Sequence, residues 1–382
     1  MSAVLTDQQW MQKALRLAQS VLHLTSPNPR VGCVIVQDHQ LVGEGATQRA
    51  GGAHAEVMAL KQARQQGANL SQCTVYVSLE PCSHYGRTPP CVEALLHARP
   101  QRVVVALVDP NPHVSGKGIQ ALRSAGIPVD VGIGAQEALE LNPGFISRMM
   151  FQRPFVWLKL ASSLDGRSAL ADGESKWITG AEARLDGHQW RARSCMVLSG
   201  IGTIVDDNPL LTVRGLDTPR QPIRAVVDSS FRIDPNAALF NGDPVWIFTT
   251  VINPEKTALL SQRNARVIVL AATADGKVNL TELFEFLRAE DINEIHVEAG
   301  ATLSGALFRQ QCVDQLLVYQ APVLLGPGRP MLQLPALPQL ADAKRFEFVD
   351  VRQVGADVRT VLREPSRWAQ LQQILDISLQ HS

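Results

Sequence analysis

Hydrophobic residues along the chain follow two spacings, which together predict an alternation of helices and strands. Apolar residues between Trp10 and Val21 recur every three or four positions, as in a helix with one buried face. Thr6 followed by Gln9 fits a capping box at the start of that helix. Mostly apolar runs predict strands at 31–36 (VGCVIV), 74–81 (TVYVSLEP) and 102–110 (RVVVALVDP).

Helices are predicted between these strands. The polar residues at 37–39 separate two apolar runs, 31–36 and 40–45, and predict a hairpin. Helices are expected at 54–67, which ends at Gly67, at 89–98, which has prolines in its first turn, and at 117–126 before a last strand. This alternation predicts an α/β fold, in which an open sheet carries helices on both faces.

The rest of the chain shows the same alternation and predicts a second α/β domain. Strands are expected at 155–166, 222–230, 244–250, 265–271, 294–300 and 315–326. Helices are expected at 181–194, 280–290 and 301–310. The join is expected within 141–154, so the predicted domains are 1–147 and 148–368, followed by a helical C-terminal tail at 369–382.

Composition narrows the class of protein. The 382 residues are enough for two domains, and 36 basic and 36 acidic residues give zero net charge. Proteins that bind along a polyanion usually carry a basic excess, so nucleic acid is not an expected partner. We find no apolar run of about 18 residues and no secretion-signal pattern, so no membrane span is expected. Six cysteines are too few for a disulfide scaffold and favour a cytoplasmic location.

The clearest candidate chemistry belongs to His54, Glu56, Cys82 and Cys91. His54 and Glu56 begin a predicted helix, Cys82 follows a strand, and Cys91 begins the next helix. One nitrogen and two sulfur ligands suit a tetrahedral Zn²⁺ whose fourth position is left for water, and zinc lowers the pKa of that water to about 7. The helix N-termini favour thiolates and a bound hydroxide. We expect Glu56 to move the proton of the water.

Two alternatives remain for these residues. A closed structural zinc site would need a fourth protein ligand, for which His84 is a stronger candidate than Cys73, because Cys73 has the setting of a buried apolar thiol. The other alternative is core cysteines and a surface histidine with no metal. The catalytic interpretation is favoured because the residues fall at strand ends and helix starts.

The His-x-Glu and Pro-Cys pattern resembles the signature of zinc-dependent nucleobase deaminases. Those deaminases commonly have two residues between the cysteines, whereas eight residues, SHYGRTPP, separate Cys82 from Cys91 here. The longer loop is expected to shape the substrate pocket. His84, Arg87 and Thr88 would contact a ring edge or a phosphate there, or else be solvated loop side chains.

Three N-terminal motifs, SPNPRVG, HAE and PCSHYGRTPPC, together resemble the deaminase half of the bacterial bifunctional riboflavin-biosynthesis deaminase–reductases. The resemblance continues through KLASSLDG and VEAGATLSGAL, so it spans nearly the whole chain. It implies a cytidine-deaminase-like N-terminal domain. The implied roles are zinc binding by His54, Cys82 and Cys91, proton transfer by Glu56, and pyrimidine binding by Asn28 and His84.

The turn after the strand at 294–300 is a second candidate site. Gly300 and Gly305 would let backbone N–H groups at a helix start approach a phosphate. The stretch matches neither a Walker loop nor the G-x-G-x-x-G fingerprint, and such turns are mostly structural. The stretch 198–211, LSGIGTIVDDNPLL, adds a second glycine turn that is typical of a plain loop when taken alone.

With KLASSLDG and GESKWITG, these stretches resemble the reductase half of the same family, which has a dihydrofolate-reductase-like fold. The resemblance implies an NADPH site formed by Ala161, Trp177, Thr203, Asp207, Ser229, Gly300, Ala301, Thr302, Leu303, Ser304, Gly305 and Ala306. It implies a substrate site formed by Ser175, Arg191, Leu211, Arg214 and Glu298.

Three cations of this half have candidate roles. Arg191 and Arg214 suit a substrate phosphate, because a guanidinium binds phosphate with two parallel hydrogen bonds, although either can be a surface ion pair of little consequence. Lys159 is expected to orient or protonate the substrate, or to be an ordinary strand-edge lysine.

The resemblance implies two consecutive reactions on one small phosphorylated pyrimidine. The first is deamination of a diaminohydroxyphosphoribosylaminopyrimidine, and the second is NADPH reduction of the ribosyl chain of the resulting uracil to a ribityl chain. A homo-oligomer, either a dimer or a tetramer, is also implied. The alternatives are a nucleoside or tRNA deaminase fused to an unrelated C-terminal domain, and a non-enzymatic zinc scaffold. The longer loop and the zero net charge favour a small substrate over RNA.

Overall fold

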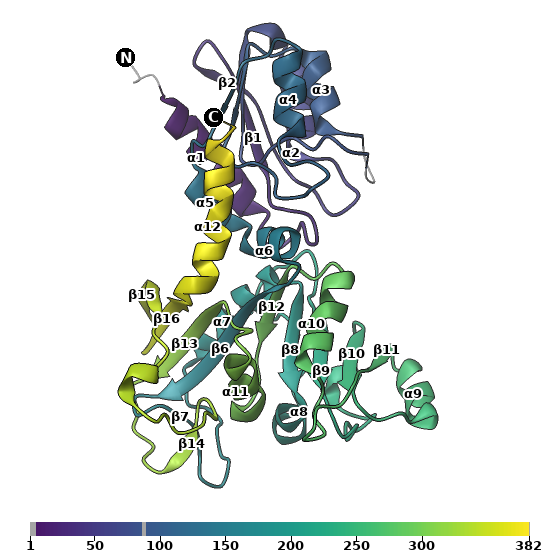
Figure 1. The fold of residues 1–382 in the computed structure, drawn as a ribbon, viewed down its shortest axis with the longest axis vertical. Helices are drawn as coiled ribbons and strands as arrows, with labels where there is room; N and C mark the ends of the chain where they lie inside the picture. Colours follow the sequence, from purple (N-terminus) through teal and green to yellow (C-terminus); the bar gives the residue numbers. More distant parts are fainter. Residues whose placement is uncertain (1–4, 86–88, 382) are drawn as a thin grey trace. The chain divides into compact units, whose positions relative to one another are not determined.

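The computed structural model describes residues 5–85 and 89–381. The chain forms two compact units (Figure 1). The first unit runs to Gln152 and also includes the segment from Ala369 onward, and the second unit is Arg153–Trp368.

The first unit is built on a five-stranded sheet in the order β2-β1-β3-β4-β5. Strand β1 is antiparallel to β2 and β3, and β3, β4 and β5 are parallel. The predicted hairpin and the buried strands after it are confirmed. The strands are β1 (Gly32–Gln37), β2 (Gln40–Ala46), β3 (Cys73–Val77), β4 (Arg102–Val105) and β5 (Val129–Val131).

Helices cover both faces of this sheet, as predicted. A Cβ added at Gly32 would lie 1.9 Å from the carbonyl oxygen of Ala14 in α1, and one at Gly45 would lie 2.5 Å from that of Ala55 in α2. Cys33 pairs with Gly45 in the ladder, so Gly32 and Gly45 face opposite sides of the pleated sheet. The helices are α1 (Asp7–Ser20), α2 (Ala55–Gln65), α3 (Cys91–Ala98), α4 (Lys117–Ser124), α5 (Ala135–Leu141) and α6 (Pro143–Phe151), with the 3-10 turn η1 (Leu70–Gln72).

The C-terminal segment is helical, and its last part packs within the first unit. Helix α12 (Pro365–Leu379) buries Leu371 and Ile374 completely. The backbone N–H of Val108 donates to the hydroxyl of Ser378 over 3.1 Å, and Arg123 donates to the carbonyl of His381 over 2.7 Å. The segment predicted as a tail therefore completes the core of the unit that begins the chain.

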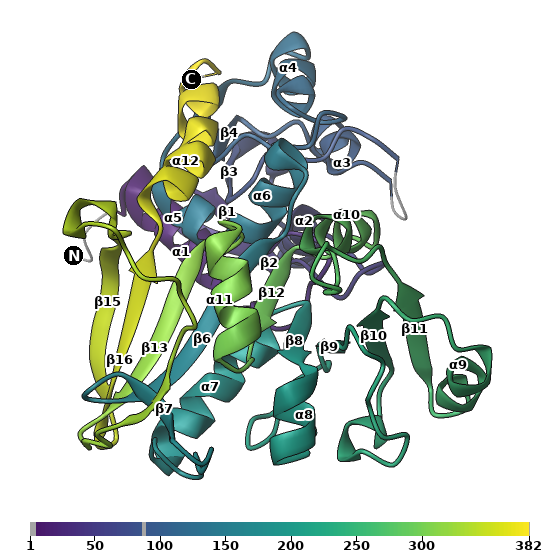
Figure 2. The same ribbon diagram turned by 60° about the horizontal axis from the view of Figure 1, so that its bottom comes forward.

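The second unit contains a nine-stranded sheet in the order β11-β10-β9-β8-β12-β6-β13-β16-β15. Figure 2 shows several of these strands side by side along their length. The seven strands from β11 to β13 are parallel, and β16 and β15 add antiparallel pairs at one edge. The strands are β6 (Phe155–Ser163), β8 (Met196–Gly200), β9 (Ile223–Val227), β10 (Val245–Thr249), β11 (Ala265–Val269), β12 (Glu294–Val297), β13 (Gln315–Ala321), β15 (Glu347–Val354) and β16 (Asp357–Arg363).

The predicted helices of this unit are present, and the stretch 198–211 is more regular than a plain loop. It contains the end of β8 and helix α8 (Ile201–Asp207), which starts at the Gly200 turn. A two-stranded ribbon of β7 (Arg167–Leu170) and β14 (Gly328–Pro330) lies outside the main sheet. The other helical elements are α7 (Ala181–Arg193), α9 (Pro254–Ser261), α10 (Leu280–Ala289), α11 (Ala301–Arg309), η2 (Ala238–Phe240) and η3 (Leu340–Asp342).

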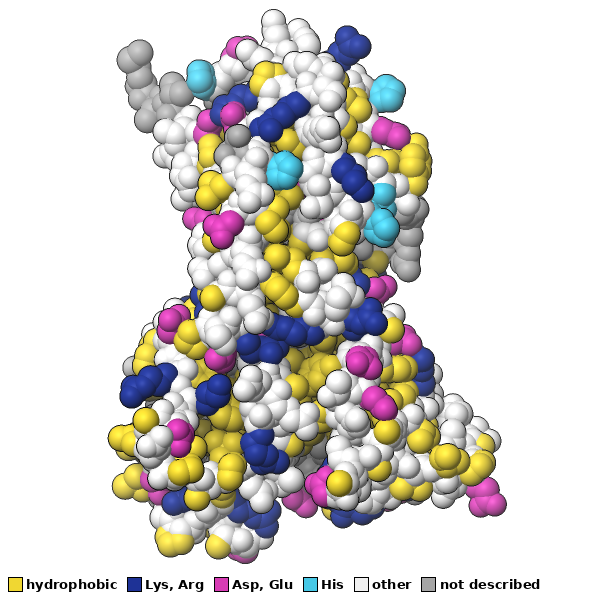
Figure 3. Space-filling model, in the orientation of Figure 1, with side chains coloured by type: hydrophobic (Ala, Val, Ile, Leu, Met, Phe, Trp, Pro, Cys, Tyr) yellow, Lys and Arg dark blue, Asp and Glu magenta, His cyan; other side chains and the backbone are white. Residues whose placement is uncertain are grey.

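Charges of both signs are mixed on the surface that Figure 3 shows, with Lys and Arg side chains interspersed among Asp and Glu. None of the helices in the described part of the chain is both long and apolar enough to span a bilayer.

Candidate active sites

Three predicted zinc ligands come together at the starts of two helices. His54 is the N-cap of α2, and Cys91 is the first residue of α3. The ligand atoms of His54, Cys82 and Cys91 all lie within 4.8 Å of one another. Nδ1 of His54 lies 3.1 Å from Sγ of Cys91 and 3.5 Å from Sγ of Cys82. Tetrahedral zinc holds such ligand atoms about 3.5 Å apart, so the cluster fits zinc.

The neighbouring side chains of the cluster favour the thiolate form of Cys82 without any metal ion. Hydrogen bonding from Cys91, and then from His54, lowers the pKa of Cys82 to about 4. The backbone N–H of Cys91 donates to Sγ of Cys82 over 3.2 Å. The interaction with Cys82 raises the pKa of Cys91 and that of His54. A cation with two positive charges would stabilise both thiolates, because metal binding requires deprotonated ligands.

Glu56 lies in the first turn of α2, one residue after Ala55, and is only 3% exposed. Burial raises the pKa of Glu56 to about 7, and the nearby charge of Cys82 raises it further, while a hydrogen bond with Cys91 opposes these effects. The carboxyl group therefore lies against the metal ligands without being one of the three clustered donors. This is the position that a proton-transferring group beside a metal-bound ligand requires.

The predicted pyrimidine-binding residues, Asn28 and His84, have no described contact with the three clustered zinc ligands. Asn28 lies in the loop before β1, where its backbone N–H donates to Thr25 over 2.9 Å. His84 is exposed, and its ring centroid lies 6.2 Å from that of His113. Within the described residues the clustered donors are three, so His84 is not a fourth one. Arg87 and Thr88 lie outside the described residues.

Two buried carboxyl groups beside the zinc cluster were missed in the sequence. Glu80 follows β3 and is 3% exposed, and Asp109 follows β4 and is 6% exposed. Burial raises the pKa of Asp109 to about 8, and the charges of Glu80 and Cys82 add to this effect. Both residues follow the carboxyl ends of parallel strands, the edge where α/β sheets place their ligands, and that position was the available signal.

In the second unit, Arg191 and Glu298 form an ion pair whose side chains are only 13% and 16% exposed. Nε of Arg191 donates to Oε1 of Glu298 over 2.5 Å, and Nη2 donates to Oε2 over 2.8 Å. Nη1 of Arg191 donates to the carbonyl of Thr212 over 2.8 Å. Burial alone would raise the pKa of Glu298, but Arg191 and His296 hold it well below its usual range. Arg191 is therefore not an exposed surface pair, and its role toward a substrate phosphate stays a prediction.

Lys159 lies in the middle of β6, next to this ion pair. Burial lowers the pKa of Lys159, Glu298 opposes that effect, and Arg191 adds to it. Its ammonium lies 5.9 Å from the centre of the Tyr319 ring. A lysine with a lowered pKa gives up a proton more easily, so this position suits a proton donor better than the edge of a strand would.

Arg214 is the more available of the two predicted phosphate ligands. It is exposed, its backbone N–H donates to Nδ1 of His188 over 3.1 Å, and its guanidinium donates to the hydroxyl of Thr212 over 3.2 Å. Leu211 lies in the same segment, is 2% exposed and has a φ of 54°. Ser175 lies in the loop before α7, and no described contact joins it to Arg191 or Glu298.

His188 is expected to make the stability of this unit sensitive to acid. Burial, and then the charges of Arg191 and Arg214, lower the pKa of His188 to about 4, from about 6.5 in an unfolded chain. Between these values the unfolded state binds more protons, so the stabilisation is fully present above pH 6.5 and is lost as the pH falls toward 4. We expect His188→Gln to lose less stability than the wild type between pH 7 and 5. Urea unfolding at both pH values checks this, and equal losses would contradict it.

The predicted NADPH residues gather at the carboxyl ends of neighbouring parallel strands. Ala161 lies in β6, Ser229 follows β9, and Gly300 follows β12 and caps α11. A Cβ built on Gly300 would have Thr203 Oγ1 as its nearest neighbour, 3.9 Å away, so the start of α11 is open. Open helix starts at this edge of a parallel sheet suit a dinucleotide phosphate.

Two other predicted NADPH residues, Asp207 and Gly305, lie close to other residues of the protein. Asp207, at the end of α8, pairs with Lys176 over 3.5 Å, and the neighbouring Trp177 is 70% exposed. A Cβ at Gly305 would lie 2.2 Å from the carbonyl oxygen of Gln333, and its approach to a phosphate stays a prediction. The close approach that requires Gly305 is therefore packing within the protein. The remaining predicted residues, Ala301, Thr302, Leu303, Ser304 and Ala306, lie in α11.

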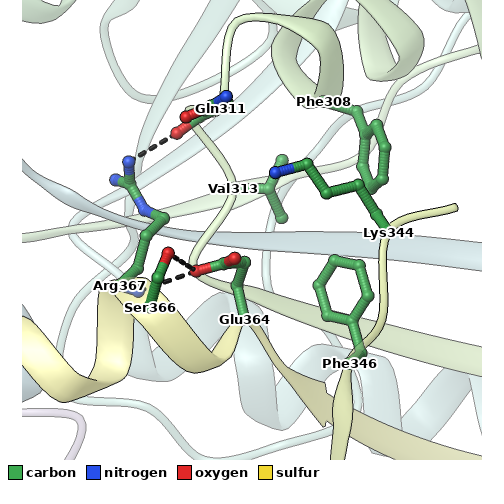
Figure 4. A pocket seen from close by; sticks show the side chains of 8 residues that line it. All are labelled: Phe308, Gln311, Val313, Lys344, Phe346, Glu364, Ser366 and Arg367. Carbon is green, nitrogen blue, oxygen red and sulfur yellow. Dashed lines mark hydrogen bonds between the residues drawn. The ribbon is translucent and has the colours of Figure 1, made fainter. Parts of the chain in front are cut away.

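A pocket elsewhere in the second unit includes none of the predicted residues. Phe308 and Phe346 stack with their ring centres 6.0 Å apart on one side, and Glu364 and Arg367 lie on the other, with the ammonium of Lys344 between them (Figure 4). Glu364 accepts from the backbone N–H of Arg367 over 2.7 Å, as at a helix start.

Comparisons with known proteins find relatives of both halves of the chain. The cytidine and deoxycytidylate deaminase zinc-binding region matches residues 5–107, and the RibD C-terminal domain matches residues 154–360. The riboflavin biosynthesis protein RibD of Escherichia coli is 44% identical over 366 residues, which cover 92% of this chain and 98% of that protein. The chain belongs to the RibD family. The RibD protein of Haemophilus influenzae is also 44% identical, over 92% of this chain and 95% of its own length.

Solved structures of RibD proteins share the whole fold. Acinetobacter baumannii RibD is 43% identical with a TM-score of 0.85, covering 94% of this chain and 98% of that one. A Thermotoga maritima protein described as a diaminohydroxyphosphoribosylaminopyrimidine deaminase/5-amino-6-(5-phosphoribosylamino)uracil reductase is 31% identical with a TM-score of 0.83, over the same shares.

Membership of the RibD family settles the class of protein. The chain is a bifunctional enzyme of riboflavin biosynthesis, with a zinc-dependent deaminase half and an NADPH-dependent reductase half. The alternative of a deaminase fused to an unrelated domain is wrong, because the RibD match includes the C-terminal half. The alternative of a non-enzymatic zinc scaffold is wrong for the same reason.

Proposed function

We propose that the chain deaminates a diaminohydroxyphosphoribosylaminopyrimidine and then reduces the ribosyl chain of the aminouracil product to a ribityl chain. The observation that carries the proposal is the cluster of His54, Cys82 and Cys91 with Glu56 beside it, in a chain that matches RibD proteins over both halves. The Thermotoga maritima relative is described by these two activities.

In the first reaction, water replaces the amino group of the pyrimidine, and ammonia leaves. His54, Cys82 and Cys91 would hold zinc, which supplies a Lewis acid that makes water nucleophilic near neutral pH. Glu56 takes the proton of the attacking water and delivers a proton to the leaving amine. Asn28 and His84 bind the pyrimidine in this proposal.

In the second reaction, the opened ribosyl chain takes up one hydride and one proton. The start of α11 at Gly300, with Thr203 nearby, would hold NADPH, which supplies the hydride. Lys159 donates the proton, Arg214 binds the substrate phosphate, and the Arg191–Glu298 pair fixes the wall of the site between them. The other residues predicted for these pockets, among them Ser175, complete the proposal.

Residues 1–147 carry the deaminase and 148–368 the reductase in this proposal. The enzyme is cytoplasmic, forms a homo-oligomer, either a dimer or a tetramer, and takes neither nucleic acid nor membrane as a partner. The zero net charge of the chain, and the mixed charges on the face that Figure 3 shows, support a small-molecule substrate.

The test supplies the pyrimidine phosphate, a free nucleoside and a tRNA separately, and follows ammonia release and NADPH oxidation. We expect ammonia from the pyrimidine phosphate alone, and NADPH oxidation that depends on the deaminated product. Ammonia release from tRNA alone would overturn the deaminase proposal. NADPH oxidation at an equal rate without the deaminated product would overturn the reductase proposal.

A further inference from the structure

One buried carboxylate connects the zinc-ligand loop to a segment far along the chain. Glu80 Oε2 accepts from the backbone N–H groups of Asp109 (3.1 Å) and Gly116 (2.9 Å). Its Oε1 accepts from those of Gly118 (2.9 Å) and Ile119 (3.2 Å). We propose that Glu80 is a positioning residue of the deaminase, which holds the segment 109–119 as one wall of the substrate pocket. This inference rests on the proposed deaminase function.

Glu80 accepts the hydrogen bonds that an N-cap side chain of α4 would otherwise accept. Helix α4 starts after Gly116, which has no side chain to accept the free N–H groups of the first turn. Three of the four bonds to Glu80 come from Gly116, Gly118 and Ile119, so a residue 36 to 39 positions earlier satisfies these donors. The negative carboxylate also suits the positive end of the helix dipole.

The zinc-ligand loop and α4 are in close contact at the same point. Glu80 is two residues before Cys82, and its backbone N–H donates to the carbonyl of Leu107 over 2.9 Å. A Cβ added at Gly118 would lie 2.3 Å from the carbonyl oxygen of Pro81. The main chain that leads into the zinc ligand Cys82 is thus positioned against the start of α4.

The anchored segment presents polar groups beside a predicted substrate ligand. Asp109 accepts from the N–H of Asn111 over 2.8 Å, and Asn111 accepts from that of His113 over 3.0 Å. These bonds fix the turn that places the ring of His113 beside that of His84, 6.2 Å between centroids. If His84 contacts the pyrimidine, His113 lines the same pocket.

The four bonds require two oxygens that only accept. In Glu80→Gln, one oxygen becomes an NH₂ group, which faces two N–H donors and cannot accept from them. We expect KM for the pyrimidine phosphate to rise at least about tenfold, because a displaced pocket wall loses contacts that hold the bound substrate in position. Zinc content stays equal to the wild type, since the three ligands are unchanged. Glu137→Gln, an exposed position on α5, is the matched control with unchanged kinetics.

The KM separates positioning from simple destabilisation. A variant that is merely less stable has fewer active molecules, which lowers the apparent kcat and leaves KM unchanged. An unchanged KM in Glu80→Gln would therefore overturn the proposal. If Glu80→Gln does not fold, Gly118→Ala provides the second variant, since its Cβ pushes α4 away from Pro81 while Glu80 is kept, and the same rise in KM is expected.

Amide hydrogen exchange tests the anchoring without any activity. In Glu80→Gln we expect faster exchange confined to peptides from 109–119, and equally accelerated exchange over the whole first unit would overturn the proposal. If the wild type releases no ammonia from the pyrimidine phosphate, the proposed function fails, and the exchange result still decides whether Glu80 holds this segment.

Discussion

Glu56→Gln is expected to lower the rate of deamination by about 10²- to 10⁴-fold, the usual contribution of a general acid–base group. Glu56 is buried beside Cys82 and Cys91, so no solvent-exposed base can replace it at the same position. Glutamine keeps the size of the side chain but cannot take up or release the proton. Ammonia release from the pyrimidine phosphate under saturating substrate measures the effect.

The same molecule provides the controls for this variant. Zinc content measured by atomic absorption is expected to stay at the wild-type value, because Glu56 is not one of the three clustered donors. NADPH oxidation with the deaminated product supplied directly is expected to be unchanged, since Glu56 belongs to the other unit. Deamination retained at the wild-type rate would remove Glu56 from the mechanism.

The zinc site was predictable because its signal is local. His54 and Glu56 are two residues apart at a helix start, and Cys82 and Cys91 flank one loop, so the ends of elements bring them together. Glu80 was not predictable in the same way. Its four partners lie 29 to 39 residues later, and nothing in the sequence near Glu80 indicates which backbone N–H groups it will meet.

Buried strands were predicted better than exposed ones. The runs 103–105 and 245–248, which form most of β4 and β10, contain no polar residue, because both faces of each strand are covered. Strand β6 is equally apolar from 155 to 160 except for Lys159. Strand β15 at the edge of the large sheet was missed, since most of its residues are exposed and its apolar residues do not repeat on one face. The sequence also did not indicate that the segment from Ala369 onward belongs to the first unit, because that segment follows the second unit in the chain.

Arg191 shows why a residue type alone did not define its contacts. The sequence predicted that Arg191 and Glu298 face the substrate, but it did not predict that they pair with each other. In the structure, all three guanidinium nitrogens of Arg191 donate to Glu298 or Thr212. The guanidinium group of Arg191 is already hydrogen-bonded to the carboxylate of Glu298 in this structure. The two residues are 107 positions apart, so only the tertiary structure brings them into contact.

Arg191→Met is expected to destabilise the second unit by about 3–5 kcal/mol and to abolish reduction. The side chains of Arg191 and Glu298 are only 13% and 16% exposed, and removing one partner of a buried pair leaves the other charge uncompensated. Urea unfolding measures the loss of stability. Deamination is expected to persist where the first unit stays folded, because the zinc cluster lies there.

The double variant Arg191→Met with Glu298→Gln separates stability from chemistry. Replacing both charges removes the unpaired carboxylate, so most of the lost stability is expected to return, as a double-mutant cycle would show. Reduction is expected to stay absent in the double variant, because the Arg191–Glu298 ion pair that shapes the site between Lys159 and Arg214 is lost. Recovery of NADPH oxidation together with stability would contradict this and would assign the pair a purely structural role.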